Sequence, residues 1–88
     1  MQFEWDPNKA ARNLRDHDVS FPTATRVFLD AFVVEIDEQD HDGELRYNVV
    51  GQVEDRLLHV TYTMRGGAYR IISARAAEPH ERRLYHEI

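Results

Sequence analysis

The stretch "ELRYNVVGQVEDRLLHVTYTMRGGAYRIISAR", residues 44–75, decides the fold. It contains three runs rich in β-branched and aromatic residues, at 44–53, 56–65 and 69–75, which short turns separate. The "GG" loop is typical of a tight hairpin between antiparallel strands. We therefore expect consecutive antiparallel strands, with Arg65 close to Arg70 across the last hairpin and Tyr62 and Ser73 further along the same pair of strands.

The segment before this stretch carries the signals of a helix start. Asp6 can cap a helix and Pro7 suits the first helical position, so we expect a helix over residues 7–17. Apolar side chains that recur every three or four residues mark the buried side of such a helix. This spacing predicts a buried stripe formed by Ala10, Ala11 and Leu14.

Turn and cap residues delimit the remaining elements. Ser20 can cap a second helix over 21–30, and β-branched residues predict a strand over 31–39. Gly43 suits the turn that follows, and Pro79 suits the first turn of a last helix over 78–87. With a short strand at 2–5, the order is one strand, two helices, four strands and a helix. This order predicts an α+β fold with an antiparallel meander sheet covered on one face.

Length and composition limit the functions that the chain can perform. The 88 residues suit one domain, 1–88, and the absence of cysteine excludes disulfides and thiolate chemistry. No long apolar run and no secretory signal are present, so we expect a cytoplasmic protein that does not contact a membrane. The formal net charge is −5, which excludes the large basic surface typical of nucleic-acid-binding domains. Arginines nevertheless gather in the last third of the chain.

Several short motifs, taken in order, resemble those of the BrnT toxin family. They are "FEWD" at 3–6, "VFLD" at 27–30, "E-x-R-Y" at 44–47, "V-x-Y-T" at 60–63, "RIISAR" at 70–75 and "ER-x-x-Y" at 81–85. The resemblance covers nearly the whole chain. It implies a RelE-like fold, ribonuclease activity and a type II toxin–antitoxin pair, whose antitoxin would be BrnA, a ribbon-helix-helix DNA-binding protein. The chain departs from the family pattern at Asp18, where glycine is usual, and at "AAEP", 76–79, where the family is often more basic.

Cleavage of RNA without a metal ion sets three chemical tasks. A 2′-hydroxyl must lose a proton, the phosphate oxygens must be neutralised, and the 5′-oxygen must gain a proton. Arginine suits the second task because its planar guanidinium binds phosphate through two hydrogen bonds and stays charged. Proton transfer could fall to Tyr62, His59 or Glu44. We therefore expect no cofactor and no metal ion, with Arg46, Tyr62, Arg65 and Arg75 in catalysis and Lys9, Arg70 and His59 in substrate binding.

Each of these side chains also has a simpler structural explanation. Arginines on antiparallel sheets often pair with acids across strands, which is the simpler explanation for Arg70 alone. Arg46 could pair with Glu44 on the same strand face, and Arg75 could pair with Glu78. Purely structural roles, in the core or in anchoring the last helix, are expected for Trp5, Tyr47 and Tyr85.

Two functions from different classes follow from these observations. The first is a toxin that cleaves RNA, stops growth and is neutralised by its antitoxin. The alternative is a non-catalytic or weakly catalytic module that binds the antitoxin and modulates its binding to DNA. Because a ribbon-helix-helix antitoxin is a dimer, we expect a heterotetramer, and operator DNA should be bound only through the antitoxin complex. Leu84 and Ile88 would offer the antitoxin an apolar contact.

Overall fold

A single five-stranded mixed sheet forms the centre of the molecule. The computed structural model describes residues 1–87, and the strands lie in the order β1-β5-β4-β3-β2. The predicted α+β class is confirmed, but the sheet has five strands and not four, because the short first strand pairs in parallel with the last one. The bounds of the strands are β1 Phe3–Glu4, β2 Val34–His41, β3 Glu44–Val53, β4 Arg56–Arg65 and β5 Ala68–Ala76.

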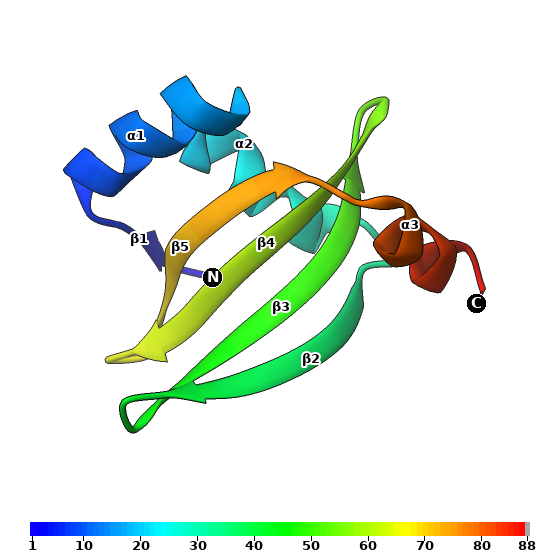
Figure 1. Ribbon diagram of the computed structural model, residues 1–88. Helices are drawn as coiled ribbons and strands as arrows, with labels where there is room; N and C mark the ends of the chain where they lie inside the picture. Colours follow the sequence, from blue (N-terminus) through cyan, green and yellow to red (C-terminus); the bar gives the residue numbers. More distant parts are fainter. Residues whose placement is uncertain (88) are drawn as a thin grey trace.

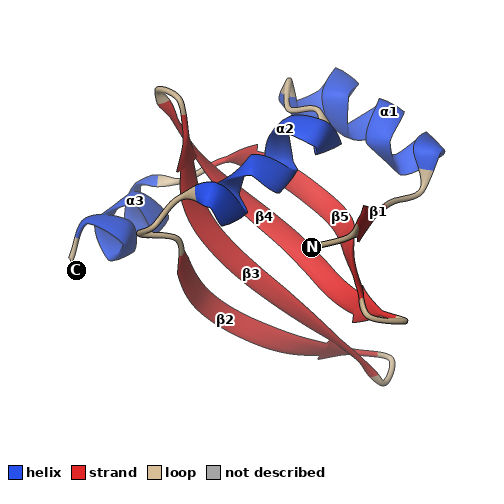
Figure 2. Cartoon of the chain, turned by 180° about the vertical axis from the view of Figure 1, so that it is seen from behind, coloured by secondary structure: helices blue, strands red, loops and turns tan. Residues whose placement is uncertain are grey.

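The helices cover the two faces of the sheet unequally. The helices α1 (Pro7–His17) and α2 (Phe21–Thr25), followed by the 3₁₀ helix η1 (Arg26–Leu29), lie over one face. The helix α3 (Pro79–His86) packs against the other face at one end of β3 and β2, as Figures 1 and 2 show from opposite sides. Most of that second face therefore has no helix over it. Residues 21–30 were expected to form one helix, and the chain instead tightens into the 3₁₀ helix after Thr25.

A buried asparagine, and not the predicted apolar stripe, anchors α1 to the sheet. Ala10 contacts the core as expected, but Ala11 and Leu14 are exposed, so that part of the prediction was wrong. Asn13 is buried instead. Its side-chain amide donates to the Val19 and Ala74 carbonyls at 2.8 Å each, and its oxygen accepts from the Ala74 N–H at 3.1 Å. These bonds tie the helix directly to the backbone of β5.

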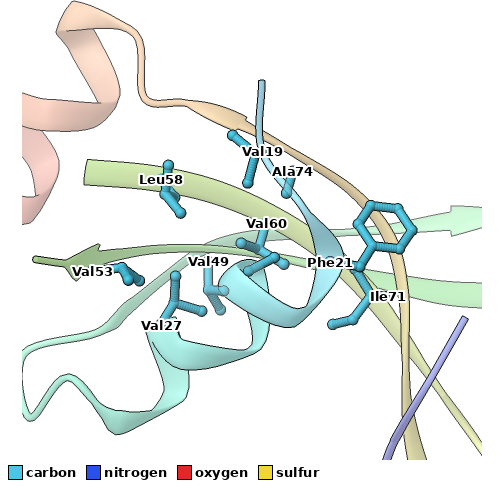
Figure 3. Close-up of a cluster of buried hydrophobic side chains, with 10 residues drawn as sticks. Val19, Phe21, Val27, Val49, Val53, Leu58, Val60, Ile71 and Ala74 are labelled. Atoms are coloured by element: carbon cyan, nitrogen blue, oxygen red, sulfur yellow. The ribbon is translucent and has the colours of Figure 1, made fainter. Parts of the chain in front are cut away.

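The main core lies between α2, η1 and the sheet (Figure 3). Gly51 of β3 permits the close approach of η1, because a Cβ atom there would lie 2.9 Å from Val27 Cβ and 3.1 Å from the Val27 carbonyl oxygen. A larger residue would force the layers apart. The buried side chains of this cluster are Val19, Phe21, Ala24, Val27, Val49, Val53, Leu58, Val60, Ile71 and Ala74.

The last hairpin fixes which side chains share a face. Its loop glycines, Gly66 and Gly67, have φ angles of 60° and 80°, as a tight two-residue turn requires. Thr63 pairs with Arg70, and an irregularity in the register next to Tyr62 shifts the pairing further along the strands. Ser73 consequently pairs with Thr61, and Tyr62 pairs with Ile71. Tyr62 and Ser73 thus lie further along the same pair of strands, as expected, but this shift puts them on opposite faces.

Within residues 1–87, no helix combines the length and apolar character needed to cross a membrane.

Candidate functional site

The uncovered face of the sheet gathers most of the polar side chains that the sequence singles out. Tyr62 packs against Phe28 of η1, with ring centroids 5.2 Å apart, so it lies on the face that α2 and η1 cover. Strand alternation then turns Thr61 and Thr63 to the opposite face. Residues that pair with these threonines, or alternate in phase with them, also lie on this second surface, which we call the arginine face. Its members include His59 and Arg75, Thr63 and Arg70, Thr61 and Ser73, together with Arg46, Asn48 and Arg65.

Five of the seven expected site residues thus share one surface, and two do not. Arg46, Arg65, Arg70, Arg75 and His59 belong to the arginine face by register. Tyr62 points to the other face, and Lys9 is exposed on α1, which lies on that other side as well.

Among the four arginines of the arginine face, Arg46 is the one whose charge is least compensated. It is half-buried near the start of β3, and its Nε atom is buried without a hydrogen-bond partner. Within residues 1–87 it forms no ion pair, because the nearby Glu44 carboxylate accepts a hydrogen bond from Arg65 at 2.8 Å instead. The suggested pairing of Arg46 with Glu44 is therefore not formed. A buried guanidinium N–H without an acceptor is costly, which makes this position well suited to a bound anion.

Arg65 and Arg70 flank Arg46 and hold weak, partly solvated ion pairs. Arg65 contacts Glu44 at 2.8 Å, and Arg70 contacts Glu4 of β1 at 3.5 Å. The hydrogen bond from Arg65 lowers the pKa of Glu44 below its ordinary value. Ion pairs this exposed typically contribute about 0–1 kcal/mol, so an incoming phosphate can replace either carboxylate at little cost. Arg70 pairs with Thr63 of β4, one residue beyond Tyr62, and Arg46 directly precedes Tyr47, the partner of Tyr62 on β3.

Arg75, in contrast, holds α3 against the sheet. Its guanidinium donates two hydrogen bonds to the Glu81 carboxylate, at 2.8 and 2.9 Å. The same carboxylate accepts from the Glu78 N–H at 2.8 Å, which completes the start of α3. Burial alone would raise the pKa of Glu81, but the hydrogen bonds from Arg75 and from the Glu78 N–H outweigh it and lower the pKa to about 2. Glu78, the suggested partner of Arg75, lies further away at 3.8 Å.

His59 lies beneath α3 and next to this ion pair. Its Nε2 is 3.6 Å from Glu81 Oε2, while its Nδ1 is buried without a hydrogen-bond partner. Burial, and then the positive charge of Arg75, lower the pKa of His59, so its imidazole is neutral at pH 7. The residue on β3 opposite His59 is Val50, four positions from Arg46, which places the two side chains about 13 Å apart along the sheet.

The expected structural aromatic residues pack as the sequence suggested. Trp5 meets Phe21 edge-on, with ring centroids 6.0 Å apart. Tyr47 stacks on Tyr62 at 5.3 Å, and burial raises the pKa of Tyr62, which keeps its phenol protonated at neutral pH. Tyr85 anchors α3 through a 2.6 Å hydrogen bond that its hydroxyl donates to an Asp30 carboxylate oxygen.

Sequence reasoning missed two groups of polar residues on the arginine face. Glu81 is the buried partner of Arg75, for which the sequence suggested Glu78 instead. A chain of hydrogen bonds also joins Thr61 to Asn48 and Asn48 to Asp37, each at 2.6 Å. The alternation of polar side chains at 46 and 48 and at 59, 61 and 63, opposite an apolar face, was a signal that could have indicated this polar surface. In the described part of the chain, no group of three His, Cys, Asp or Glu residues is arranged to hold a metal ion.

The match to a family model decides the class of protein. A model described as "Ribonuclease toxin, BrnT, of type II toxin-antitoxin system" matches residues 5–81. The chain belongs to the BrnT family. The match extends over β2 to β5 and ends at Glu81, so it includes every arginine of the arginine face. Among curated proteins, none is a significant match. As a BrnT family member, the chain is a toxin of a type II toxin–antitoxin system, a class that acts with an antitoxin partner, and the family is one of ribonucleases.

Proposed function

We propose that this BrnT toxin is an endoribonuclease that binds RNA on the arginine face and cleaves it without a metal ion. The observation that carries the proposal is Arg46, a half-buried guanidinium on that face whose Nε has no hydrogen-bond partner. A phosphate group would supply the missing acceptor and the opposite charge in one step. Three hydroxyl side chains on the same face, Thr61, Thr63 and Ser73, make the surface polar.

Arg65 and Arg70 extend this anion site when phosphate displaces their carboxylate partners. Each of the two ion pairs is partly solvated and rests on a single contact, whereas a guanidinium–phosphate pair can form two hydrogen bonds and carries more negative charge. The displaced carboxylate of Glu44 would no longer accept the hydrogen bond that lowers its pKa, and would become a stronger base. Glu44 is then the group closest to Arg46 and Arg65 that can take a proton from a 2′-hydroxyl.

The roles expected for the remaining residues are revised accordingly. Arg75 and His59 lie beneath or beside α3, and Arg75 already donates two hydrogen bonds to Glu81. We propose that they hold the end of the arginine face in shape and contact no RNA. Tyr62 and Lys9 lie on the other side of the sheet, so they can meet RNA only where it passes round the ends of the strands.

Expression of single variants in cells tests the proposed activity. The wild-type chain, produced without its antitoxin, should arrest growth and degrade cellular RNA, and Arg46→Ala should do neither. Arg12→Ala is the matched control, because Arg12 is exposed on α1, away from the arginine face. Growth arrest by the Arg46→Ala variant at equal protein level would contradict the proposal.

We further propose a ribbon-helix-helix antitoxin of the BrnA type, held in a heterotetramer of two toxins on one antitoxin dimer. The net charge of −5 favours operator binding through the antitoxin and not through the toxin. Exposed apolar side chains suited to a partner include Leu29 at 82% and Phe32 at 67%, with Leu84 on α3. Ile88, expected to join them, lies outside the described residues. Co-purification, mass measurement and a DNA shift assay test this assembly, and a shift of operator DNA by the toxin alone would refute it.

The alternative of a weakly catalytic co-repressor module rests on a different observation. Arg65, Arg70 and Arg75 all have carboxylate partners already, so much of the positive charge on the arginine face is compensated. RNA that stays intact with purified toxin, together with tighter operator binding by the toxin–antitoxin complex than by the antitoxin alone, would favour this function.

A further inference from the structure

The strands β3 and β4 separate at the end of the sheet that carries the hairpin tips. Their last register pair is Tyr47 with Tyr62, although both strands continue beyond it. The tip between β2 and β3 and the tip between β4 and β5 lie near one another at one end of the molecule, as both views show (Figures 1 and 2). A cleft of about 410 Å³ lies there, and its lining residues are Gly43, Glu44, Leu45, Tyr47, Thr63 and Met64.

The walls of this cleft suit a flat aromatic ring. Leu45 and Met64 are large apolar side chains that remain 47% and 42% exposed, with no part of the described chain covering them. Tyr47 is half-buried and stacks on Tyr62 with an interplanar angle of 27°. A planar group that entered the cleft would meet an aromatic ring already fixed in orientation, together with polarizable apolar side chains.

The cleft adjoins the arginine face at the end of the sheet. Glu44 and Thr63 line it and belong to the arginine face by strand alternation, whereas Leu45, Tyr47 and Met64 belong to the other face. Arg65 directly follows Met64 in the chain, and Arg46 lies between Leu45 and Tyr47. The tips are unobstructed, because a Cβ atom added at Gly43, Gly66 or Gly67 would meet no atom within 4 Å. A chain molecule can therefore pass round this end from one face to the other.

We propose that the cleft binds one unpaired nucleobase of an RNA strand, whose neighbouring phosphate contacts Arg46 and Arg65. This inference rests on the proposed ribonuclease function and names its substrate class as single-stranded RNA. A base within a duplex is covered on both faces by its neighbours and cannot stack on Tyr47, so double-stranded RNA would gain only the phosphate contacts. Leu45 and Met64 would then determine which bases fit.

Binding of a short single-stranded RNA tests the cleft separately from catalysis. The probe is a fluorescein-labelled octaribonucleotide with 2′-O-methyl groups, which lacks the attacking hydroxyl and so cannot be cleaved during an anisotropy titration. Stacking of a base on an aromatic side chain is worth about 1–3 kcal/mol, so Tyr47→Leu should raise Kd by roughly 5- to 150-fold. Tyr47→Phe keeps the ring and should bind as the wild type does.

Two further variants keep the experiment decisive. Met64→Asp places a carboxylate in the cleft on an exposed side chain, so it should weaken binding without disturbing the core even if Tyr47→Leu folds poorly. Phe32→Ala removes an exposed apolar side chain elsewhere and should leave Kd unchanged. The methylated duplex of the same sequence should bind more weakly than the single strand.

If the wild type, Tyr47→Leu and Met64→Asp bind the probe equally well, the cleft does not bind a base. That result would not contradict ribonuclease activity at the arginine face. Tighter binding of the duplex than of the single strand would also contradict the proposed base-binding cleft. So would a cleft that the antitoxin covers, if Tyr47→Leu and Met64→Asp leave RNA binding unchanged. If the wild-type chain neither binds the probe nor cleaves unmodified RNA, both base binding in the cleft and the proposed ribonuclease function are wrong.

Discussion

Replacing Glu81 by glutamine should loosen α3 from the sheet and remove a defined part of the pH dependence of folding. Glu81 is only 3% exposed and accepts two hydrogen bonds from Arg75 and one from the Glu78 N–H. Its pKa is lowered from 4.5 to about 2, against the opposing effect of burial. Each tenfold change in proton affinity corresponds to about 1.36 kcal/mol, so ionised Glu81 contributes on the order of 3 kcal/mol to the free energy of unfolding.

The sign of the pH effect follows from the direction of the pKa change. Because the folded state lowers the pKa of Glu81, its contribution is fully present above pH 4.5 and is lost as the pH falls towards 2. Glu81→Gln should therefore destabilise the protein at pH 7 and flatten the stability curve between pH 4.5 and 2. For a domain of this size, a loss of about 3 kcal/mol lowers Tm by roughly 10 °C or more.

Thermal melts followed by circular dichroism between pH 2 and pH 7 measure this effect. Glu87→Gln is the matched control, because Glu87 lies at the end of the same helix and is exposed. The reasoning is refuted if Glu81→Gln melts like the wild type at pH 7, or if its stability falls between pH 4.5 and 2 as steeply as that of the wild type.

Two further substitutions test the packing that positions the arginine face. Asn13→Ala removes the side-chain bonds to Val19 and Ala74 and leaves buried backbone groups unpaired, so unfolding should become easier by about 2–4 kcal/mol in urea titrations. A stability equal to that of the wild type would mean that water replaces these bonds. Gly51→Ala would push a methyl group to within 2.9 Å of Val27 Cβ and should cost about 1–3 kcal/mol in the same titration, and an unchanged midpoint would show that η1 shifts freely.

The strands were predictable because their signals are local. Alternating β-branched residues and the "GG" turn placed β3 and β4 with their observed bounds, Glu44–Val53 and Arg56–Arg65. The position of β1 was not predictable in the same way, because a two-residue strand carries almost no pattern and its pairing with β5 depends on the path of α1. The buried side of α1 was misassigned for a related reason. Hydropathy favours Leu14 over Asn13, but three hydrogen bonds to distant backbone make the asparagine the better buried residue.

The candidate site was predictable only in part. Strand alternation within β3, β4 and β5 brought Arg46, Arg65 and Arg70 to one face. The sequence did not reveal the shifted register beside Tyr62, nor which acids pair with Arg70 and Arg75. Glu4 reaches Arg70 from the first strand and Glu81 reaches Arg75 from the last helix, and such contacts depend on the tertiary arrangement. Only the completed fold therefore distinguishes the uncompensated Arg46 from arginines that hold the structure together.

The most direct test of the central claim is the rate at which purified toxin cleaves a single-stranded RNA in the presence of EDTA, under single-turnover conditions. The account predicts cleavage by the wild type and by Arg12→Ala at equal rates. Arg46→Ala, folded as judged by circular dichroism, should be slower by about 10²–10³, the typical loss when one charge-stabilising donor is removed. Cleavage that requires an added divalent metal ion, or an Arg46→Ala variant as fast as the wild type, would contradict the account.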